Sequence, residues 1–477
     1  MRNSRSDFLA RRAFLRRSGQ LAMAGVAAPF ALSLAAIGEA AAQTATDYKA
    51  LVCVFLYGGN DHGNTVVPYD NLNYDRYSAI RGGGAGRTAG GIALAQADLF
   101  ATALTPAADA PALANGLSYA LHPSMTAMKS LFDSGKAAVQ LNVGPLVIPM
   151  TKDQYNNRNR VLNPLPPKLF SHNDQQSIWQ SSSPEGSTIG WGGNLGDLAL
   201  ASNTDAVFTC ISVTGNAVFL SGDTARPYSV SSNGAVAVKG IQGNVYGSRA
   251  VKDALATLIQ QTRSQTLENE YARVMQRSIA SEAKVESALA GTTLATAFPD
   301  TGLADQFKIV ARLIASRSAL GTKRQVFMVS LGGFDLHDNL IANHPRLLAQ
   351  VSDAMSAFYS ATTELGIANN VTAFTASDFG RTLASNGDGT DHGWGNHHFV
   401  VGGAVRGQRF YGTAPAVEVG GAGDVGQGRL LPTTSVDQFA ATLATWFGVS
   451  ASEMPLVVPN IDSFGGSGYP ANLGFLG

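Results

Sequence analysis

Six short apolar runs, each long enough for one buried strand, recur along the chain between segments with helical periodicity. These runs span residues 50–57, 137–143, 206–213, 325–331, 371–376 and 399–405. Their length and near-continuous apolar character are typical of strands that are covered on both faces. Strands that alternate with helices predict an α/β fold, a three-layer sandwich in which a mostly parallel central sheet carries helices on both faces.

Helical stripes of apolar residues fill several of the intervals. One covers residues 347–365, a second lies in a long candidate helix over residues 251–288, and a third covers residues 436–446. Residues 215–250 break the alternation, because they are polar and rich in Gly, Ser and Asn, and we interpret them as an inserted loop or small hairpin that lies over the sheet. Since no linker separates two parts, residues 43–477 are expected to form a single domain.

The N-terminus has the order of a targeting peptide. The pair Arg11-Arg12 precedes an apolar stretch over residues 21–37, and small residues follow at 40–42. This order predicts a cleaved twin-arginine signal peptide over residues 1–42, with the twin-arginine translocation machinery as the partner during export. The alternative is a retained anchor, but the stretch barely reaches the ~20 apolar residues that a span needs. We therefore expect a periplasmic or secreted protein with no transmembrane anchor after cleavage.

Charge argues against a nucleic-acid partner. The whole chain has 34 basic and 34 acidic residues, and removing the six arginines and two acids of residues 1–42 leaves 28 basic and 32 acidic residues. A net charge of about −4 repels phosphate backbones, which bind to positive surfaces.

The two cysteines, Cys53 and Cys210, both lie in strand-like apolar runs, which favours buried thiols. A disulfide between them stays open, since pairing cannot be deduced from two positions.

Acidic residues follow three of the predicted strands. Asp61 comes shortly after the first strand, Asp335 follows residues 325–331, and Asp378 follows residues 371–376. In an open parallel sheet, ligands bind outside the carboxyl ends of the strands, so these side chains are expected to share one pocket. Six of the eight histidines lie in or close to the same loops: His62, His337, His344, His392, His397 and His398.

Clustered carboxylates repel one another unless a proton or a cation lies among them. Asp together with His is a ligand set for Zn²⁺, Mn²⁺ or Fe, whereas carboxylates alone suit Mg²⁺ and Ca²⁺. Glycine-rich loops that contain an Asp also form ordinary turns, in which the Asp side chain bonds to the nearby backbone. Three such loops at equivalent strand ends favour a functional pocket over turns alone.

Ser171 precedes a helix-like run and has Asp174 three residues further on. This spacing is typical of a helix N-cap with a capping-box partner. A hydroxyl at a helix N-terminus beside a metal pocket is also a place where a nucleophile would be activated. The two interpretations are compatible.

These motifs resemble those of a large family of exported bacterial proteins known as domain of unknown function 1501. The resemblance rests on the twin-arginine leader and on Val54–Pro68, Leu121–Pro123, Ser171-His172, Gly190–Gly193, Gly332–His337, Ser377–Arg381, Thr390–Gly393 and Val401–Gly403. They extend in order along nearly the whole mature chain. That family is similar to the alkaline phosphatase and sulfatase superfamily, which implies an alkaline phosphatase-like sandwich with metal sites at the strand ends and a nucleophile that opens a helix.

The resemblance also implies roles for individual residues. Ser171 corresponds to the nucleophile, and Arg381 or His392 would stabilise charge on the transferred group. The implied ligands of a divalent metal (Zn, Mn, Mg or Ca) are Asp61, Asp335, His337, Asp378 and His392. One position departs from the superfamily pattern, because Phe379 stands where its Ser-Asp-His-Gly motif has a histidine.

Two functions follow from this pattern. The first is an exported metal-dependent hydrolase that acts on phosphate or sulfate esters, with a small molecule or a glycan ester as substrate. The alternative is a non-catalytic cell-envelope binding protein that retains the fold with a degenerate metal pocket, and Phe379 favours it. Fold alone does not decide between them.

Overall fold

The computed structural model describes residues 45–83, 90–466 and 468–477. The predicted targeting peptide, residues 1–42, lies outside the described residues. Residues 48–477 form one compact unit. No helix among the described residues is long and apolar enough to cross a membrane.

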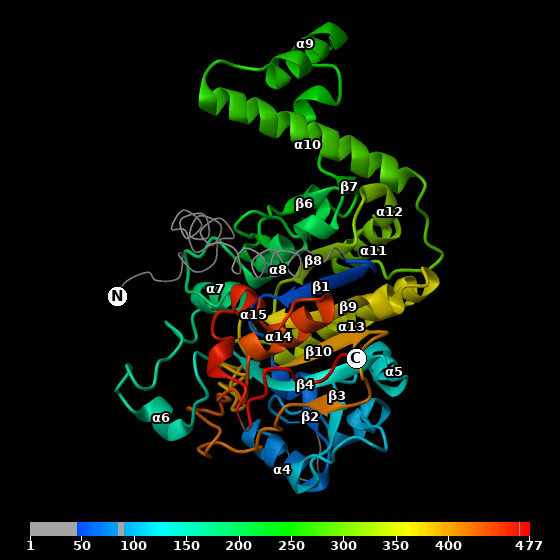
Figure 1. Ribbon diagram of the computed structural model, residues 1–477. Coiled ribbons are helices and arrows are strands. Elements are labelled where there is room, and N and C mark those ends of the chain that lie inside the picture. Colours follow the sequence, from blue (N-terminus) through cyan, green and yellow to red (C-terminus); the bar gives the residue numbers. More distant parts are fainter. Residues whose placement is uncertain (1–44, 84–89, 467) are drawn as a thin grey trace. The chain divides into compact units, whose positions relative to one another are not determined.

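A ten-stranded sheet forms the centre of this unit (Figure 1). Its order is β11 (Phe410–Tyr411), β4 (Ala137–Gly144), β10 (Asn396–Gly402), β9 (Val371–Ser377), β1 (Lys49–Leu56), β8 (Arg324–Leu331), β5 (Cys210–Ser212), β6 (Tyr228–Ser231) and β7 (Gly234–Ala235), and β12 (Thr434–Ser435) pairs with β4. Strand β10 runs antiparallel to both of its neighbours, β7 runs antiparallel to β6, and the other pairs are parallel. The predicted mostly parallel α/β sheet is confirmed.

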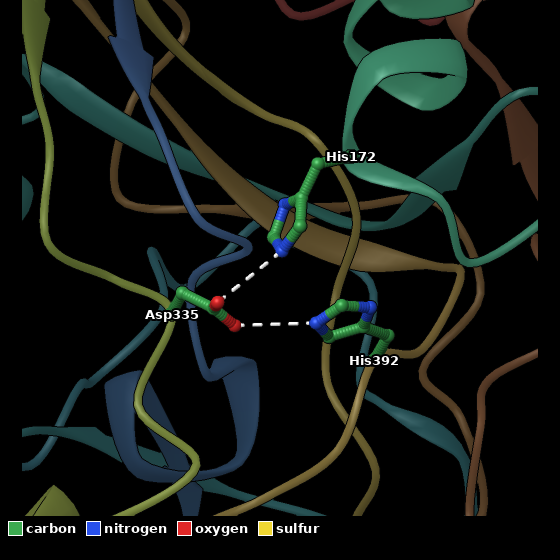
Figure 2. A group of neighbouring side chains, drawn as sticks. All are labelled: His172, Asp335 and His392. Carbon is green, nitrogen blue, oxygen red and sulfur yellow. Dashed lines mark hydrogen bonds and ion pairs between the residues drawn. The ribbon is translucent and has the colours of Figure 1, made fainter.

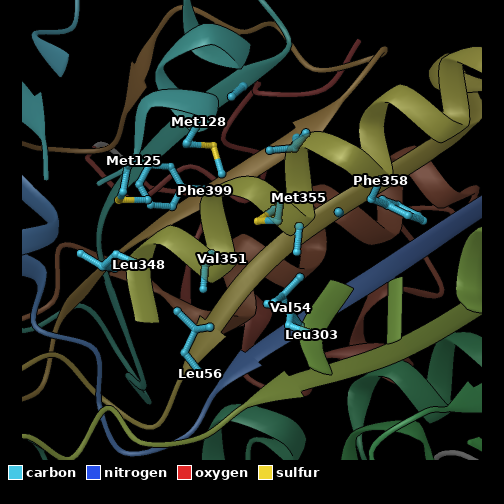
Figure 3. Close-up of a cluster of buried hydrophobic side chains, with 14 of the residues drawn as sticks. Val54, Leu56, Met125, Met128, Leu303, Leu348, Val351, Met355, Phe358 and Phe399 are labelled. Atoms are coloured by element: carbon cyan, nitrogen blue, oxygen red, sulfur yellow. The ribbon is translucent and has the colours of Figure 1, made fainter. Parts of the chain in front are cut away.

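Strand β1 has two different apolar faces because successive side chains of a strand point to opposite sides. Val52 and Val54 belong to one hydrophobic cluster, together with residues of α5 (Thr126–Asp133), α11 (Gly302–Ala315) and α13 (Leu340–Glu364). Figure 3 shows Val54 near Met355 and Phe358 of α13. Leu51 belongs to the opposite cluster, with α8 (Trp191–Ala199), α14 (Val436–Phe447) and α15 (Met454–Val457). Helices therefore cover both faces, as predicted.

Further helices and strands connect these elements. They are α3 (His62–Thr65), β2 (Val66–Pro68), α4 (Asn71–Ile80), β3 (Tyr119–Leu121), α6 (Lys152–Asn156), α7 (His172–Ser181), α9 (Arg249–Gln260), α10 (Thr266–Ala290) and α12 (Arg317–Leu320). Strand β2 pairs with β3 in a separate two-stranded sheet.

Two expectations about the middle of the chain need correction. The segment 215–250 contains the expected small hairpin, β6 and β7, but since β6 pairs with β5 the hairpin extends the edge of the sheet instead of lying over its face. The single helix expected over residues 251–288 is two helices, α9 and α10 (Figure 1). The polar residues between them break the helix, and Gln261 is extended. The apolar stripe on α10 is not core, because Leu267 and Tyr271 are exposed.

The two cysteines are buried free thiols, as their apolar surroundings predicted. Cys53 lies on β1 and Cys210 on β5, and β8 runs between these strands. Two strand spacings amount to about 10 Å, which is beyond the reach of a disulfide. Burial raises the pKa of both thiols, so the reactive thiolate is scarce at neutral pH.

We therefore expect neither thiol to react with Ellman's reagent in the native protein, and both to react after unfolding in guanidinium without a reductant. Absorbance at the wavelength of the released thiolate measures this directly. Rapid labelling of the native protein would contradict the burial of the thiols. Absence of labelling after unfolding would indicate that the two cysteines are paired.

Candidate metal centre

Three strands deliver their loops to one edge of the sheet. In the register of the sheet Leu56 of β1 lies opposite Leu331 of β8 and Ser377 of β9, so all three strands end level. The turn after β1 requires glycine, since Gly58 has a φ of 115° and a Cβ there would lie 2.3 Å from the Asp335 backbone nitrogen. This close approach of the β1 loop to the β8 loop sets the position of Asp335.

Asp335, His337 and His392 converge on one point beyond these strands. The Asp335 Oδ1 atom lies 3.1 Å from His337 Nε2 and 3.2 Å from His392 Nε2, and the two Nε2 atoms are 2.9 Å apart. Ligand atoms of a tetrahedral zinc site, each about 2.0–2.1 Å from the metal, lie about 3.3 Å from one another. The distances among these three atoms are therefore close to those between the ligand atoms of one bound cation.

His172, the first residue of α7, adds a third imidazole (Figure 2). Its Nε2 atom lies 3.4 Å from Asp335 Oδ2, and its ring centroid lies 4.3 Å from that of His392. Single ligand atoms of His172, Asp335 and His392 all lie within 4.8 Å of one another. Sequence reasoning did not assign a ligand role to His172, although the residue follows Ser171 directly.

The other nitrogens of these rings are engaged away from the centre. His172 Nδ1 donates to Asp378 Oδ2 at 2.7 Å, and this hydrogen bond raises the pKa of His172. His392 Nδ1 donates to the Phe170 carbonyl at 2.8 Å, while burial lowers the pKa of His392. Such partners fix the tautomer of a neutral imidazole and leave the Nε2 lone pair free for a ligand.

His337 follows the same pattern, with Nδ1 3.3 Å from Asp391 Oδ1. In their neutral forms the rings of His337 and His392 thus point two Nε2 lone pairs at each other and at the Asp335 carboxylate. Lone pairs at this separation repel unless a proton or a cation lies between them. This donor set fits a divalent metal that binds imidazole.

Arg381 holds Asp335 in place. The Arg381 side chain is fully buried, and its Nη1 donates to Asp335 Oδ1 and to the Gly58 carbonyl, both at 2.8 Å. Its Nε donates to Thr390 Oγ1 at 3.0 Å. Burial would raise the pKa of Asp335, but the hydrogen bond and charge of Arg381 outweigh it and lower that pKa. Arg381 therefore positions a ligand from inside the protein.

Asp378 lies behind the centre instead of in it. Its Oδ2 accepts hydrogen bonds from His172, from Gln176 Nε2 at 2.8 Å and from the Gly58 amide at 3.2 Å. Gln176, which the sequence did not single out, lies one helical turn after His172 and so shares its face of α7. The Oδ1 atom of Asp378 is buried without a hydrogen-bond partner among the described residues.

Phe379 forms the floor of the site. Its ring is 1% exposed, and its centroid lies 4.8 Å from that of His172 and 4.7 Å from that of His392. The ring packs against both imidazoles at a position where a histidine was expected. It supports the two imidazoles and offers no metal-binding atom of its own.

Asp61 is neutralised by the protein itself. Arg81, at the end of α4, donates to both carboxylate oxygens of Asp61 at 2.9 and 3.1 Å, and Thr390 Oγ1 donates to Oδ2 at 2.9 Å. Both charged side chains are buried. Burial would raise the pKa of Asp61, but the charge of Arg81 lowers it. The structure therefore does not bring Asp61 into the cluster, and no sequence motif pointed to Arg81.

Ser171 is the N-cap residue of α7 by position. Its hydroxyl donates to Asp174 Oδ2 at 3.0 Å and makes no capping bond to the helix backbone. The preceding Phe170 has a φ of 73°, a left-handed conformation that is rare for an aromatic residue. This turn directs the Phe170 carbonyl to His392 and places Ser171 directly before His172.

The chain matches a family described as a protein of unknown function (DUF1501) over residues 48–455. It belongs to the DUF1501 family. No curated protein matched.

Solved structures that resemble this DUF1501 protein include the PsFucS1 sulfatase from Pseudoalteromonas sp., with a TM-score of 0.34, 9% identity, and coverage of 89% of this chain and 72% of that one. The lipoteichoic acid synthase LtaP from Listeria monocytogenes has a TM-score of 0.31 and 9% identity, with 87% and 75% covered. A Bacteroides thetaiotaomicron protein of glycosaminoglycan metabolism has a TM-score of 0.31 and 10% identity, with 85% and 74% covered.

The remaining histidines of this DUF1501 protein are buried in its interior: His62, His122, His344, His397 and His398. Desolvation lowers the pKa of His62 and His122 to about 4 and that of His344 and His398 to about 3. They remain neutral at physiological pH and are separate from the three rings that meet at Asp335.

The structure predicts that Arg81→Leu lowers the free energy of unfolding by about 3–5 kcal/mol, because the Asp61 carboxylate would stay buried without its partner. Urea unfolding followed by circular dichroism measures this. The control Arg76→Leu, at an exposed position of the same helix, should change stability by no more than about 0.5 kcal/mol. Equal stabilities of the two variants would show that the buried pair is not structural.

Proposed function

We propose that this protein is an exported metal-dependent hydrolase of phosphate or sulfate esters, with a small molecule or a glycan ester as substrate. The observation that carries the proposal is the convergence of His337 Nε2, His392 Nε2 and Asp335 Oδ1 within 2.9–3.2 Å of one another. The side chains of Asp335 and His337 are 44% and 41% exposed, so a substrate can reach them.

In this proposal Asp335, His337 and His392 hold one divalent cation, with His172 as a further ligand. Two or three imidazoles and one carboxylate favour Zn²⁺, Mn²⁺ or Fe²⁺ over Mg²⁺ and Ca²⁺, which prefer oxygen ligands. A cation bound there would polarise an ester oxygen and lower the pKa of a hydroxyl beside it. Asp378 and Arg381 keep His172 and Asp335 in place.

Ser171 is the nucleophile in this proposal. Its Oγ would form a bond to phosphorus or sulfur while the bond to the leaving alcohol breaks, and its proton would pass to Asp174, which already accepts its hydrogen bond. The leaving oxygen would take a proton from a solvent water, and a second water would then release the group from Ser171 and return the proton from Asp174 to solvent. His392 acts as a neutral metal ligand in this proposal, and the buried Arg381 acts through Asp335 instead of touching the substrate.

We further propose that residues 1–42 are a twin-arginine signal peptide and that residues 43–477 act as a single mature domain in the periplasm or outside the cell. The sequence order of paired arginines, apolar stretch and small residues supports this. The twin-arginine route carries folded cargo, so the cation could be loaded before export.

Metal content provides a first test. We expect about one divalent metal ion per chain in the purified protein by elemental analysis, and loss of the metal in His337→Ala and Asp335→Ala. Asp61→Asn should keep it, because Asp61 is bound to Arg81. Full occupancy in the His337 and Asp335 variants, or loss of metal in Asp61→Asn alone, would contradict this assignment.

Catalysis is tested with 4-nitrophenyl phosphate and 4-nitrophenyl sulfate. We expect Ser171→Ala to lose nearly all hydrolysis while it keeps its metal, because the nucleophile is gone and the ligands remain. Ser177→Ala, on the same helix, is the matched control and should be as active as the native protein. A protein that binds metal but hydrolyses neither these esters nor a broader ester panel would favour the cell-envelope binding function, which the Asp61–Arg81 pair and Phe379 support.

A further inference from the structure

An open cavity lies at the opposite end of β1 from the metal centre. Its volume is about 630 Å³, within the range of about 300–1,000 Å³ that small-molecule sites occupy. Lys49, the first residue of β1, lines one side, and the metal centre lies beyond Leu56 at the other end of the same strand. The wall is completed by Asn369, just before β9, and by residues of the loop after β10, the end of α14 and the last part of the sequence, among them Arg406, Thr445, Trp446 and Asn472.

The side chains of the lining carry positive charge. They include Lys49 and Arg406 and no acidic side chain, while Gly477, the last residue of the sequence, adds one carboxylate beside Arg406. Within residues 45–83, 90–466 and 468–477, the exposed Arg406 guanidinium makes no ion pair or hydrogen bond. A guanidinium beside a cavity is a ready site for a planar anionic group such as sulfate or carboxylate.

An aromatic ring forms another part of the wall. The Lys49 ammonium donates to the Trp446 carbonyl at 2.6 Å and lies 5.3 Å from the centroid of the Trp446 ring, which fixes the half-buried indole. An indole face packs against the apolar CH face of a sugar ring, and the amides of Asn369 and Asn472 can bond to its hydroxyls. Aromatic, amide and cationic groups thus line one cavity.

We propose that this cavity binds an anionic saccharide, a sugar that carries a sulfate or carboxylate group. Arg406 contacts the anion, Trp446 packs against the ring, and the two asparagines bond to hydroxyls. The site is separate from the metal centre and does not depend on the hydrolase proposal. A free oligosaccharide and the end of a polymer share this chemistry.

Trp446 provides a built-in reporter. The other three tryptophans, Trp179, Trp191 and Trp394, are at most 1% exposed, so a ligand in this cavity would change the fluorescence emission of Trp446.

The probes are a heparin tetrasaccharide, the same tetrasaccharide after desulfation, sodium sulfate and intact heparin. We expect a saturable change with the sulfated tetrasaccharide and a much weaker one with the desulfated form, and Trp446→Phe should abolish the signal. Intact heparin that binds no tighter than the tetrasaccharide would indicate recognition of a short unit, and tighter binding would indicate a polymer; both agree with the proposal.

Arg406→Gln should weaken binding of the tetrasaccharide by at least about tenfold, because a hydrogen bond to a charged group is lost. Arg273→Gln, which changes an exposed arginine of α10, is the matched control and should bind normally. His337→Ala should also bind normally, which separates this site from the metal centre. The proposal is overturned by the absence of a saturable change, by an equal response to sodium sulfate or to the desulfated sugar, or by unchanged affinity in Arg406→Gln.

Discussion

The Arg381 guanidinium connects the loops that build the candidate centre. Its donors reach the Gly58 carbonyl after β1, the Asp335 carboxylate after β8 and the Thr390 hydroxyl before β10. A buried cation costs free energy unless each donor is satisfied, so these loops are held in one arrangement. That arrangement places Asp335 where the imidazoles of His337 and His392 meet.

Two carboxylates at the same sheet edge are neutralised in different ways. Asp61 is deeply buried and is paired with Arg81, and Thr390 links it to Arg381 through hydrogen bonds. Asp335 is open to solvent and faces imidazole lone pairs. The Arg81 guanidinium permanently neutralises Asp61, whereas Asp335 lies where an exchangeable cation can bind. This division favours one metal site over two in this protein.

The sequence predicted the parts of the structure that depend on local pattern. Buried strands have a recognisable apolar run, and parallel strands deliver their following loops to one edge, so the loops that carry Asp335 and Asp378 lie together. The sequence did not predict Arg81, which lies in no motif near Asp61 and reaches it only through the folded path of α4. The break between α9 and α10 was also missed, since residues 261–265 contain no Gly or Pro that would mark it, and an apolar stripe does not show which helix is buried.

The role of His172 depends on tertiary geometry in the same way. Its position after Ser171 gave no indication that its ring would turn toward Asp335, because the hydrogen bond from its Nδ1 to Asp378 sets that direction. Asp378 was expected to bind metal directly and instead supports a histidine. Strand ends thus identify which residues gather at the site, whereas the contacts between loops decide which of them face the ligand.

X-ray absorption spectroscopy of the zinc-loaded mature protein tests the central claim most directly. The account predicts a first shell of two or three imidazole nitrogens at about 2.0–2.1 Å with one carboxylate oxygen, and the multiple-scattering pattern of imidazole rings. His337→Ala, which should lose its metal, should show no such zinc shell. A shell of oxygen atoms alone, or a protein that takes up no zinc, would contradict the account and would mean that protons alone neutralise Asp335, His337 and His392.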